Sequence, residues 1–374
     1  SPVGTIIPIS PYKFCEEYTG LKKRRYIEAC SNLYDWSAKV SMFIKVEKQP
    51  MDKILTKPPR AIQFRSRQFN ILIGRHLKPL EEFYYRDHWE QTGEDNPIAK
   101  FMNNKERAAR LRRMWRKYKD PIAVLLDHSK FDSSVNVHHL KATHRWYRKN
   151  CPAIWRYIRE QLRNKGATKH WQYEVDGTRM SGDYDTALGN TYINHNVLQG
   201  FLAYFGIDGD ILLDGDDSVI VMEREDLGKI HNPDMYFKKC GFDTKMEIVE
   251  QFEKIEFCQA RPVKTVNGWV MARNPHRVIS HSQVIVRPYT GKAALQWMAG
   301  VGAAEEACGR GLPIQQELGK YYRTVHEKPL FDDETRYRLE RLGFEGESTI
   351  TDEARFSYFE AWGISPDQQR EIEA

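Results

Sequence analysis

Residues 211–222 read Ile211-Leu-Leu-Asp-Gly-Asp-Asp-Ser-Val-Ile-Val-Met222, two apolar runs on either side of Asp214-Gly-Asp-Asp217. Such runs are typical of buried strands, and Asp-Gly between them is a strong signal for a tight hairpin turn. The stretch therefore predicts an antiparallel hairpin that carries carboxylates at its tip. Because Asp-Gly is also ordinary turn chemistry, the triplet by itself does not specify a catalytic site.

A second apolar run, Ile122-Ala-Val-Leu-Leu126, ends at Asp127 and predicts another buried strand. If the two segments are neighbours in one sheet, Asp127, Asp216 and Asp217 converge at its end. Carboxylates that lie so close repel one another unless cations neutralise them, and hard oxygen ligands suit Mg²⁺. The pattern allows a site for two Mg²⁺ ions, with Mn²⁺ as a substitute, beside the plainer interpretation of a solvated turn.

The other periodicities predict a chain that mixes helices and strands. A helix is expected from about Thr186 to Phe205, where Thr186, Asn190 and Asn194 recur every four residues and share one face. We further expect strands and loops over 45–80, a helix over 97–119, a helix over 135–165, a helix near 226–240, strands around 253–273 and helices beyond about 290.

Composition narrows the function classes. A length of 374 residues suits two or three folded lobes. A hydrophobic fraction of 41% is enough for a sizeable core and excludes a chain that is disordered throughout. No apolar run approaches the ~18 residues that cross a bilayer. Six scattered cysteines without a CxxC pair fit neither a disulfide framework nor a zinc knuckle, and His138, His139 and His144 are expected on a helix surface.

Charge is unevenly distributed along the chain. Residues 1–170 hold 35 Lys+Arg against 17 Asp+Glu, a net charge of +18, whereas residues 171–374 have a net charge of −12. A basic half of this kind suits contact with a polyanion. On the helix expected over 97–119, Arg112 and Arg116 lie beside an apolar face, which fits either phosphate binding or plain solvation.

Several short patterns occur in a fixed order, and together they resemble motifs A, B and C of viral RNA-dependent RNA polymerases. They are Asp127-x4-Asp132, Ser181-Gly182-x3-Thr186-x3-Asn190 and Gly215-Asp216-Asp217. Upstream, Lys45-Val-Glu-Lys48 and Lys57-Pro-Pro-Arg60-Ala-Ile62 resemble motif F, and downstream Glu256-Phe-Cys-Gln-Ala260 resembles motif E. The amino-acid sequences of these segments are most similar to those of the tombusvirus-like group of positive-strand RNA viruses. The resemblance covers about residues 20–275.

The resemblance implies an α+β fold, a right-hand polymerase with fingers, palm and thumb and an antiparallel palm sheet. The implied domains are an N-terminal segment with fingers (1–119, motif F-like 45–62), a palm (120–262) with a finger insertion at about 145–175, and a thumb (263–374). Within the palm, the motifs fall at 127–132 (A), 181–190 (B), 215–217 (C), near 245 (D) and 257–259 (E).

The resemblance also assigns roles to matching residues. Asp127, Asp216 and Asp217 are expected to bind metal, and Lys245 to protonate the leaving pyrophosphate, with Lys238 and Lys239 as rivals. Expected nucleotide contacts are Lys45, Lys48, Lys57, Arg60, Asp132, Ser181, Thr186 and Asn190. Expected RNA contacts are Gly182, whose missing Cβ lets backbone approach the template, together with Phe257, Cys258, Gln259 and the helix residues Arg112 and Arg116.

The implied activity is RNA-templated RNA synthesis in viral genome replication and transcription, by two-metal-ion nucleotidyl transfer. A polar Asp132 beside Asn190 favours ribonucleotides, since both can bond the 2′-hydroxyl. The alternatives are a reverse transcriptase or other palm polymerase, and a catalytically inactive RNA-binding replication scaffold. Implied partners are template and nascent RNA, ribonucleoside triphosphates and other replicase proteins encoded upstream. The implied location is the host cytoplasm, in a membrane-associated complex formed through segments or partners outside this chain.

Overall fold

The computed structural model describes residues 6–168, 170–332, 335–336, 339 and 348–374. A four-stranded sheet lies at its centre in the order β6-β7-β3-β8, and every neighbouring pair in it is antiparallel. The strands are β3 (Pro121–His128), β6 (Gly209–Asp214), β7 (Asp217–Glu223) and β8 (Thr244–Val249). The predicted hairpin and the predicted strand before Asp127 are therefore confirmed, and they are neighbours.

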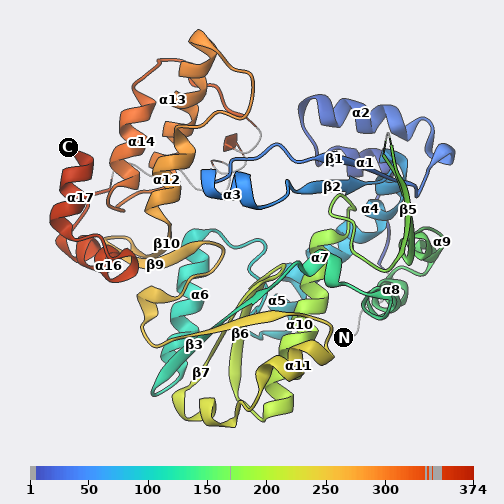
Figure 1. The fold of residues 1–374 in the computed structure, drawn as a ribbon, viewed down its shortest axis with the longest axis horizontal. Coiled ribbons are helices and arrows are strands. Elements are labelled where there is room, and N and C mark those ends of the chain that lie inside the picture. Colours follow the sequence, from blue (N-terminus) through green and yellow to red (C-terminus); the bar gives the residue numbers. More distant parts are fainter. Residues whose placement is uncertain (1–5, 169, 333–334, 337–338, 340–347) are drawn as a thin grey trace.

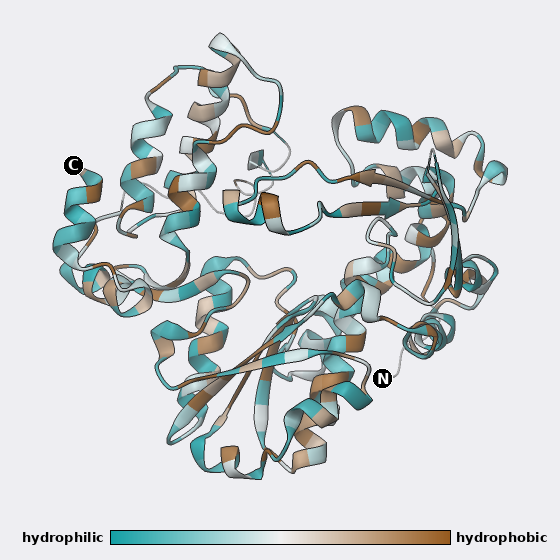
Figure 2. Ribbon diagram, viewed as in Figure 1, coloured by the Kyte–Doolittle hydropathy of each residue, from teal (hydrophilic) through white to brown (hydrophobic). Residues whose placement is uncertain are grey.

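Apolar side chains fill both faces of this central sheet, and Figure 2 shows hydrophobic residues along its strands. One face packs on α6 (Asn104–Lys117), where Leu111 is fully buried. The other face packs on α10 (Thr186–Phe205) through Phe201, and on α11 (Pro233–Lys239). Burial on both sides explains why β3 and β7 are nearly continuous apolar runs rather than alternating ones. Helix α10 has the bounds expected from the sequence.

A second, mixed sheet has the order β2-β1-β4-β5. Its strand β1 (Val40–Ile44) pairs antiparallel with β2 (Ala61–Phe64) and parallel with β4 (Arg163–Ala167), which pairs antiparallel with β5 (Gln172–Asp176). The parallel pair joins the N-terminal segment to a segment inserted between β3 and α10. The helices of this body are α1 (Pro11–Cys15), α2 (Gly20–Cys30), α4 (Arg67–Glu82), α8 (Val137–Asn150) and α9 (Trp155–Ile158) (Figure 1).

The C-terminal part forms a third body, which Figure 1 shows apart from the second sheet. It begins with the hairpin β9 (Ala260–Thr265) and β10 (Gly268–Arg273), which packs on α6. Its helices are α12 (Pro275–Ser282), α13 (Gly291–Cys308), α14 (Gln315–Arg323), α16 (Asp352–Trp362) and α17 (Pro366–Glu373). The segment expected to form a thumb, 263–374, includes residues 333–334, 337–338 and 340–347, which lie outside the described residues.

Three further helices are short: α3 (Met51–Thr56), α5 (His88–Thr92) and α7 (Phe131–Ser134). Helix α3 lies between β1 and β2 of the second sheet, and α7 follows β3 of the central sheet. In Figure 1, α3 reaches from the second sheet toward the C-terminal helices. No helix among the described residues is long and apolar enough to cross a bilayer. The three bodies give an α+β structure with mainly antiparallel sheets, in agreement with the fold class predicted from the sequence.

Two expectations about secondary structure were wrong. Residues 67–82 form α4 rather than strands and loops, because Ser66 caps the helix and Phe69, Ile73 and Leu77 recur on a buried face. The helix expected over 135–165 ends at Asn150, since a proline follows two residues later and the chain then enters β4.

The expectation that His138, His139 and His144 are helix-surface residues was wrong for His144. Its side chain is buried, and its Nε2 lies 3.1 Å from Oε1 of Gln161. Burial lowers the pKa of His144 to about 4, so the ring is neutral.

Helices α13 and α14 cross at two glycines. A Cβ on Gly319 would lie 2.2 Å from the backbone nitrogen of Glu306, and one on Gly302 would lie 2.3 Å from the backbone nitrogen of Arg323. Backbone atoms on a packed helix cannot rotate away as the end of a flexible side chain can. The close approach of the two helices therefore depends on the missing side chains.

We expect Gly319→Ala to lower the free energy of unfolding by about 1–3 kcal/mol, because the added methyl forces the two helices apart. Urea unfolding followed by circular dichroism measures this. Gly228→Ala is the matched control, since Gly228 is exposed and its Cβ would meet nothing within 4 Å. Equal stability of the two variants would contradict the tight crossing.

Candidate active site

Two carboxylates and a lysine meet at one end of the central sheet. Asp127 near the end of β3 stands directly opposite Lys245 in β8. On the other side of β3, Leu126 pairs with Ser218 of β7, so Asp217, one residue earlier in β7, borders Asp127. Asp216 precedes Asp217 in the turn between β6 and β7. The register thus gathers the acidic residues of motifs A and C and the predicted lysine of motif D.

A cavity of about 340 Å³ opens beside this group. Six of the predicted site residues line it: Asp127, Asp217, Lys245, Phe257, Cys258 and Gln259. Its wall also holds Lys254 and Arg261. Residues that are far apart in the sequence therefore share one pocket, as the ordered motifs predicted.

The turn that carries Asp216 is a two-residue hairpin loop. Asp214 pairs with Asp217 across it, and Gly215 has a φ of +70°. A positive φ at the first central residue alone is what a type II′ turn requires, and glycine adopts it without strain. The conformation of the turn thus explains why the first residue of the Gly-Asp-Asp triplet is glycine.

The carboxylates of this turn titrate in opposite directions. Burial, together with the charges of Asp216, Asp214 and Asp127, raises the pKa of Asp217 to about 6. Burial and neighbouring carboxylates also raise the pKa of Asp216. Burial alone would raise the pKa of Asp214 too, but Lys100 and Arg107 outweigh it and lower that pKa. The Arg107 Nη2 donates to Asp214 Oδ2 at 2.6 Å.

The carboxylate oxygens of this site suit a divalent cation, although they do not surround one completely. In the part of the chain that the structure describes, no group of three or more Asp, Glu, His or Cys side chains forms a ready-made metal cage. Burial, with a further contribution from neighbouring carboxylates, raises the pKa values of Asp216 and Asp217 and so disfavours their ionised forms. A hard cation that takes its other ligands from water and phosphate suits such a site.

Helix α10 presents motif B residues toward this group. The Asn190 Nδ2 donates to Asp132 Oδ1 at 2.7 Å, which confirms that these two side chains are neighbours. The Thr186 hydroxyl donates instead to the carbonyls of Met180 and Asp183, at 2.7 and 2.8 Å. Thr186 therefore holds the loop before α10, and a contact from its hydroxyl to a nucleotide stays a prediction.

The Ser181-Gly182 loop lies against β2. The Gly182 N–H donates to the Gln63 carbonyl at 2.7 Å, and the Ser181 hydroxyl accepts from the Gln63 N–H at 3.1 Å. A Cβ on Gly182 would lie 2.7 Å from the Gln63 carbonyl oxygen. In this structure the missing Cβ admits the backbone of β2, and the approach of template RNA to Gly182 stays a prediction.

The motif F-like cations occupy the segment around β1, α3 and β2. Lys45 and Arg60 both approach Glu47, at 3.3 and 3.5 Å. Lys48 reaches the C-terminal body, where it donates to the His281 carbonyl and lies 5.3 Å from the centre of the Trp297 ring. Lys57 is exposed at the end of α3. Glu47, which was not among the predicted site residues, therefore partly neutralises this segment.

The motif E-like residues form an unusual turn. Phe257 and Ala260 exchange both backbone hydrogen bonds, and Cys258 and Gln259 between them have φ values of +50° and +61°. Two positive φ values define a type I′ turn, which costs about 1–2 kcal/mol for each residue that is not glycine. The turn points Cys258 into the cavity beside Asp217. Burial raises the pKa of the Cys258 thiol, so this side chain stays protonated near neutral pH.

The two predicted arginines of α6 differ in their surroundings. The guanidinium of Arg112 lies 4.9 Å from the ring centre of Phe252 and 5.2 Å from that of Trp269. Arg116 is exposed. Arg112 thus packs α6 against the β9–β10 hairpin, and RNA contacts by either arginine stay a prediction.

Sequence reasoning missed a buried ionic network beneath the loop that precedes α10. The Arg65 Nε donates to Asp183 at 2.9 Å, and the Arg179 Nη1 donates to Asp185 at 2.6 Å. The Gln161 amide bridges the two aspartates, at 3.0 and 2.8 Å. No periodicity marks these residues, because their partners come from the residue after β2, the inserted segment and the loop itself.

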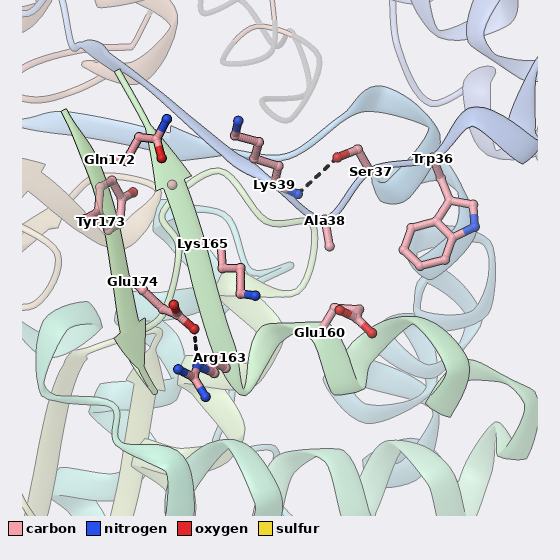
Figure 3. A pocket seen from close by; sticks show the side chains of 11 residues that line it. Trp36, Ser37, Ala38, Lys39, Glu160, Arg163, Lys165, Gln172, Tyr173 and Glu174 are labelled. Carbon is pink, nitrogen blue, oxygen red and sulfur yellow. Dashed lines mark hydrogen bonds and ion pairs between the residues drawn. The ribbon is translucent and has the colours of Figure 1, made fainter. Parts of the chain in front are cut away.

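A larger cavity, of about 730 Å³, lies elsewhere in the second body (Figure 3). It opens between residues 36–39 and the strands β4 and β5, and Arg163 pairs with Glu174 on its wall. None of the predicted site residues lines it. The smaller cavity beside Asp127 is therefore the candidate site, even though it is not the more spacious one.

Carboxylates from two strands, a facing lysine and two further basic side chains on the cavity wall define a class of site suited to phosphoryl-group chemistry on a polyanionic substrate. The comparisons with known proteins are more specific. The whole chain, residues 1–374, matches the family model described as viral RNA dependent RNA polymerase, and the chain belongs to that family.

Three relatives illustrate the similarity, and each is named an RNA-directed RNA polymerase. The chain is 31% identical to that of Tobacco necrosis virus (strain A), over 98% of this chain and 53% of the relative. It is 31% identical to that of Maize chlorotic mottle virus (isolate United States/Kansas/1987), over 99% and 40%, and 32% identical to that of Melon necrotic spot virus, over 100% and 50%. The chain spans about half the length of these relatives. The predicted resemblance to the tombusvirus-like group is confirmed.

We expect Asp217→Asn to raise the melting temperature of the metal-free chain at about pH 7.5. The fold disfavours ionised Asp217, whose pKa of about 6 lies above its unfolded value. The contribution of the Asp217 carboxyl to the stability of the fold is therefore complete below the pKa that this carboxyl has in the unfolded chain. It is lost as the pH rises through 6. The advantage of the variant should shrink when the pH is lowered to about 4. Differential scanning fluorimetry in EDTA measures both values.

Added Mg²⁺ should then stabilise the unmodified chain more than the Asp217→Asn variant, because the cation relieves the same repulsion. Asp208→Asn is the control, since Asp208 is an exposed aspartate next to the same sheet. Identical melting temperatures of all three proteins in EDTA at about pH 7.5 would contradict the unneutralised carboxylate cluster.

Proposed function

We propose that this chain catalyses RNA-templated RNA synthesis, the activity named for its relatives, as part of viral genome replication and transcription. The observation that carries the proposal is the convergence of Asp127, Asp217 and Lys245 on one cavity, from three strands of the central sheet. Membership of the viral RNA-dependent RNA polymerase family supports it.

We propose a right-hand arrangement for the three bodies. The central sheet, within 120–262, is the palm. The second sheet combines residues 1–119 with the insertion at about 145–175 and forms the fingers, an assignment supported by the parallel pairing of β1 with β4. The C-terminal body, 263–374, is the thumb. The contact of Lys48 with the carbonyl of His281 joins the proposed fingers to the proposed thumb.

In the proposed reaction, the 3′-hydroxyl of the nascent strand attacks the α-phosphate of an incoming ribonucleotide, and pyrophosphate leaves. Asp127, Asp216 and Asp217 would hold two divalent cations, Mg²⁺ with Mn²⁺ as a substitute. When bound, these cations activate the hydroxyl and neutralise charge on the leaving group.

Lys245 is the proposed proton donor to the pyrophosphate oxygen. Its position opposite Asp127 and on the cavity wall supports this choice over Lys238 and Lys239, which lie in α11 and do not line the cavity. An ammonium group at this point also balances part of the negative charge of the carboxylates.

The remaining predicted residues would select and hold the nucleotide. The bonded pair Asp132–Asn190 presents polar groups suited to a 2′-hydroxyl, and Lys45, Lys48, Lys57 and Arg60 present cations suited to a triphosphate. The side-chain oxygen of Asn190, Oδ1, is buried and has no hydrogen-bond partner among the described residues. It is therefore available to accept a hydrogen bond from a polar ligand.

We further propose that template and nascent RNA contact Gly182, the 257–259 turn, Arg112 and Arg116. The other proposed partners are replicase proteins encoded upstream. The proposed location is a membrane-associated replication complex in the host cytoplasm, formed through segments or partners outside this chain.

We expect Asp216→Ala to reduce incorporation of ribonucleotides on an RNA template by about 10³-fold or more, because the metal site loses a ligand. Gel analysis of labelled products with Mg²⁺ and with Mn²⁺ measures it, and circular dichroism checks the fold. Asp208→Asn should retain activity. Undiminished synthesis by Asp216→Ala would refute the proposed mechanism.

The same assay separates the alternatives. A reverse transcriptase would prefer deoxyribonucleotides on the RNA template, whereas an inactive scaffold would bind RNA without extending either kind of nucleotide. The Asp132–Asn190 pair argues for ribonucleotides, since a bulky side chain in this place would exclude the 2′-hydroxyl.

We expect Asn190→Ala to lower discrimination between ribo- and deoxyribonucleotides by about 3–10-fold, the effect of one lost hydrogen bond. The ratio of kcat/KM for UTP and dUTP measures it. Asn196→Ala is the control on the same helix, because Asn196 is exposed and its amide nitrogen donates to the carbonyl of Tyr192. An unchanged ratio would show that Asn190 does not contact the sugar.

A further inference from the structure

A buried polar layer lies directly beneath the candidate active site, and none of the sequence motifs includes all of it. His128, Thr244 and Asn194 are 3%, 8% and 0% exposed. The His128 Nδ1 lies 2.7 Å from Thr244 Oγ1, and its Nε2 lies 3.1 Å from Asn194 Oδ1. The Asn194 Nδ2 lies 2.9 Å from the carbonyl oxygen of Gly215 and 3.3 Å from that of Asp216.

The direction of these hydrogen bonds follows from the atoms involved. Backbone carbonyls only accept, so the Asn194 amide nitrogen donates to the turn, and its Oδ1 must accept from His128 Nε2–H. His128 Nδ1 then accepts from the Thr244 hydroxyl, because a neutral imidazole carries one N–H. Thr244, His128 and Asn194 thus form a directed chain that ends on the Gly215-Asp216 turn.

The alternation of side chains along a strand connects this layer to the site above it. In the pairing of β3 with β8, Asp127 stands opposite Lys245 and His128 stands opposite Thr244. Successive side chains of a strand point to opposite faces. Asp127 and Lys245 therefore face the cavity, and the next pair in register faces the interior toward α10. Any slip between β3 and β8 would break the His128–Thr244 bond as well as separate Asp127 from Lys245.

We propose that Thr244, His128 and Asn194 are positioning residues, which fix the Gly215-Asp216 turn and the β3–β8 register so that Asp127, Asp216 and Lys245 meet at one point. The proposal rests on the proposed function for its catalytic consequence. Its physical basis is that mutually repelling carboxylates must be held by something other than themselves. The buried hydrogen-bond network of Thr244, His128 and Asn194 holds them at the turn, where the backbones of the two strands no longer bond each other.

The test uses Thr244→Val, which keeps the shape of the side chain and its preference for strands but removes the hydroxyl donor. We expect kcat for nucleotide incorporation to fall about tenfold and the half-saturating Mg²⁺ concentration to rise by a similar factor, as for residues that orient metal ligands. KM for nucleotide and the Kd for RNA should change by less than about twofold, since neither ligand touches the layer. Thr244→Ser, which restores a hydroxyl, should recover most of both losses.

Thr143→Val is the matched control. Thr143 is buried like Thr244, but in the described part of the chain its hydroxyl donates to the His139 carbonyl within α8 and not to the active-site turn. A decrease in thermal stability shared by the two Thr→Val variants, with the same kcat and Mg²⁺ dependence in both, would assign the layer a merely structural role and overturn the proposal.

A second readout does not depend on activity. Hydrogen–deuterium exchange of the peptide covering 214–217 should be faster in Thr244→Val and in Asn194→Ala than in Thr143→Val and the unmodified chain. Unchanged exchange there would overturn the proposal even if activity fell.

The two proposals fail in different ways. If the unmodified chain synthesises RNA and Thr244→Val matches it in kcat and Mg²⁺ dependence, the positioning role is wrong and the proposed function stands. If the unmodified chain makes no RNA but exchange over 214–217 rises in the variants, the proposed function is wrong and the positioning of the turn stands.

Discussion

The pairing of β3 between β7 and β8 is the constraint on which the candidate site depends. It places Asp127 beside Asp217 on one side and opposite Lys245 on the other, although these residues come from three distant parts of the chain. The apolar residues of β3 and β7 are buried on both faces, so a shift of one residue in their register would move hydrophobic and charged side chains into the wrong surroundings. The core thus specifies the site.

Charge in the site is only partly balanced by the chain. Arg107 and Lys100 neutralise Asp214, whereas Asp216 and Asp217 keep raised pKa values because burial and mutual repulsion disfavour their ionised forms. Asp214 is thus neutralised within the chain, whereas Asp216 and Asp217 remain suited to a cation from outside it.

The structure gives several expected ligand contacts a second explanation. Ser181, Gly182 and Thr186 hold the loop before α10 and attach it to β2, and the buried pairs Arg65–Asp183 and Arg179–Asp185 anchor it from below. The loop of motif B is therefore tied to the strand of motif F. Residues conspicuous in a motif can thus serve the geometry of a loop as well as a ligand.

The sequence by itself determined the hairpin at Asp214–Asp217, the strand before Asp127, helix α10 and the family, because apolar periodicity, turn chemistry and motif order are local signals. The neighbourhood of Asp132 and Asn190 also followed from the motif resemblance and agrees with their hydrogen bond. Only the tertiary structure decided the burial of His144, the helix α4, the Glu47 pairs and the layer of His128, Thr244 and Asn194. These depend on partners from remote elements, and a hydrogen bond between distant residues leaves no period in the chain.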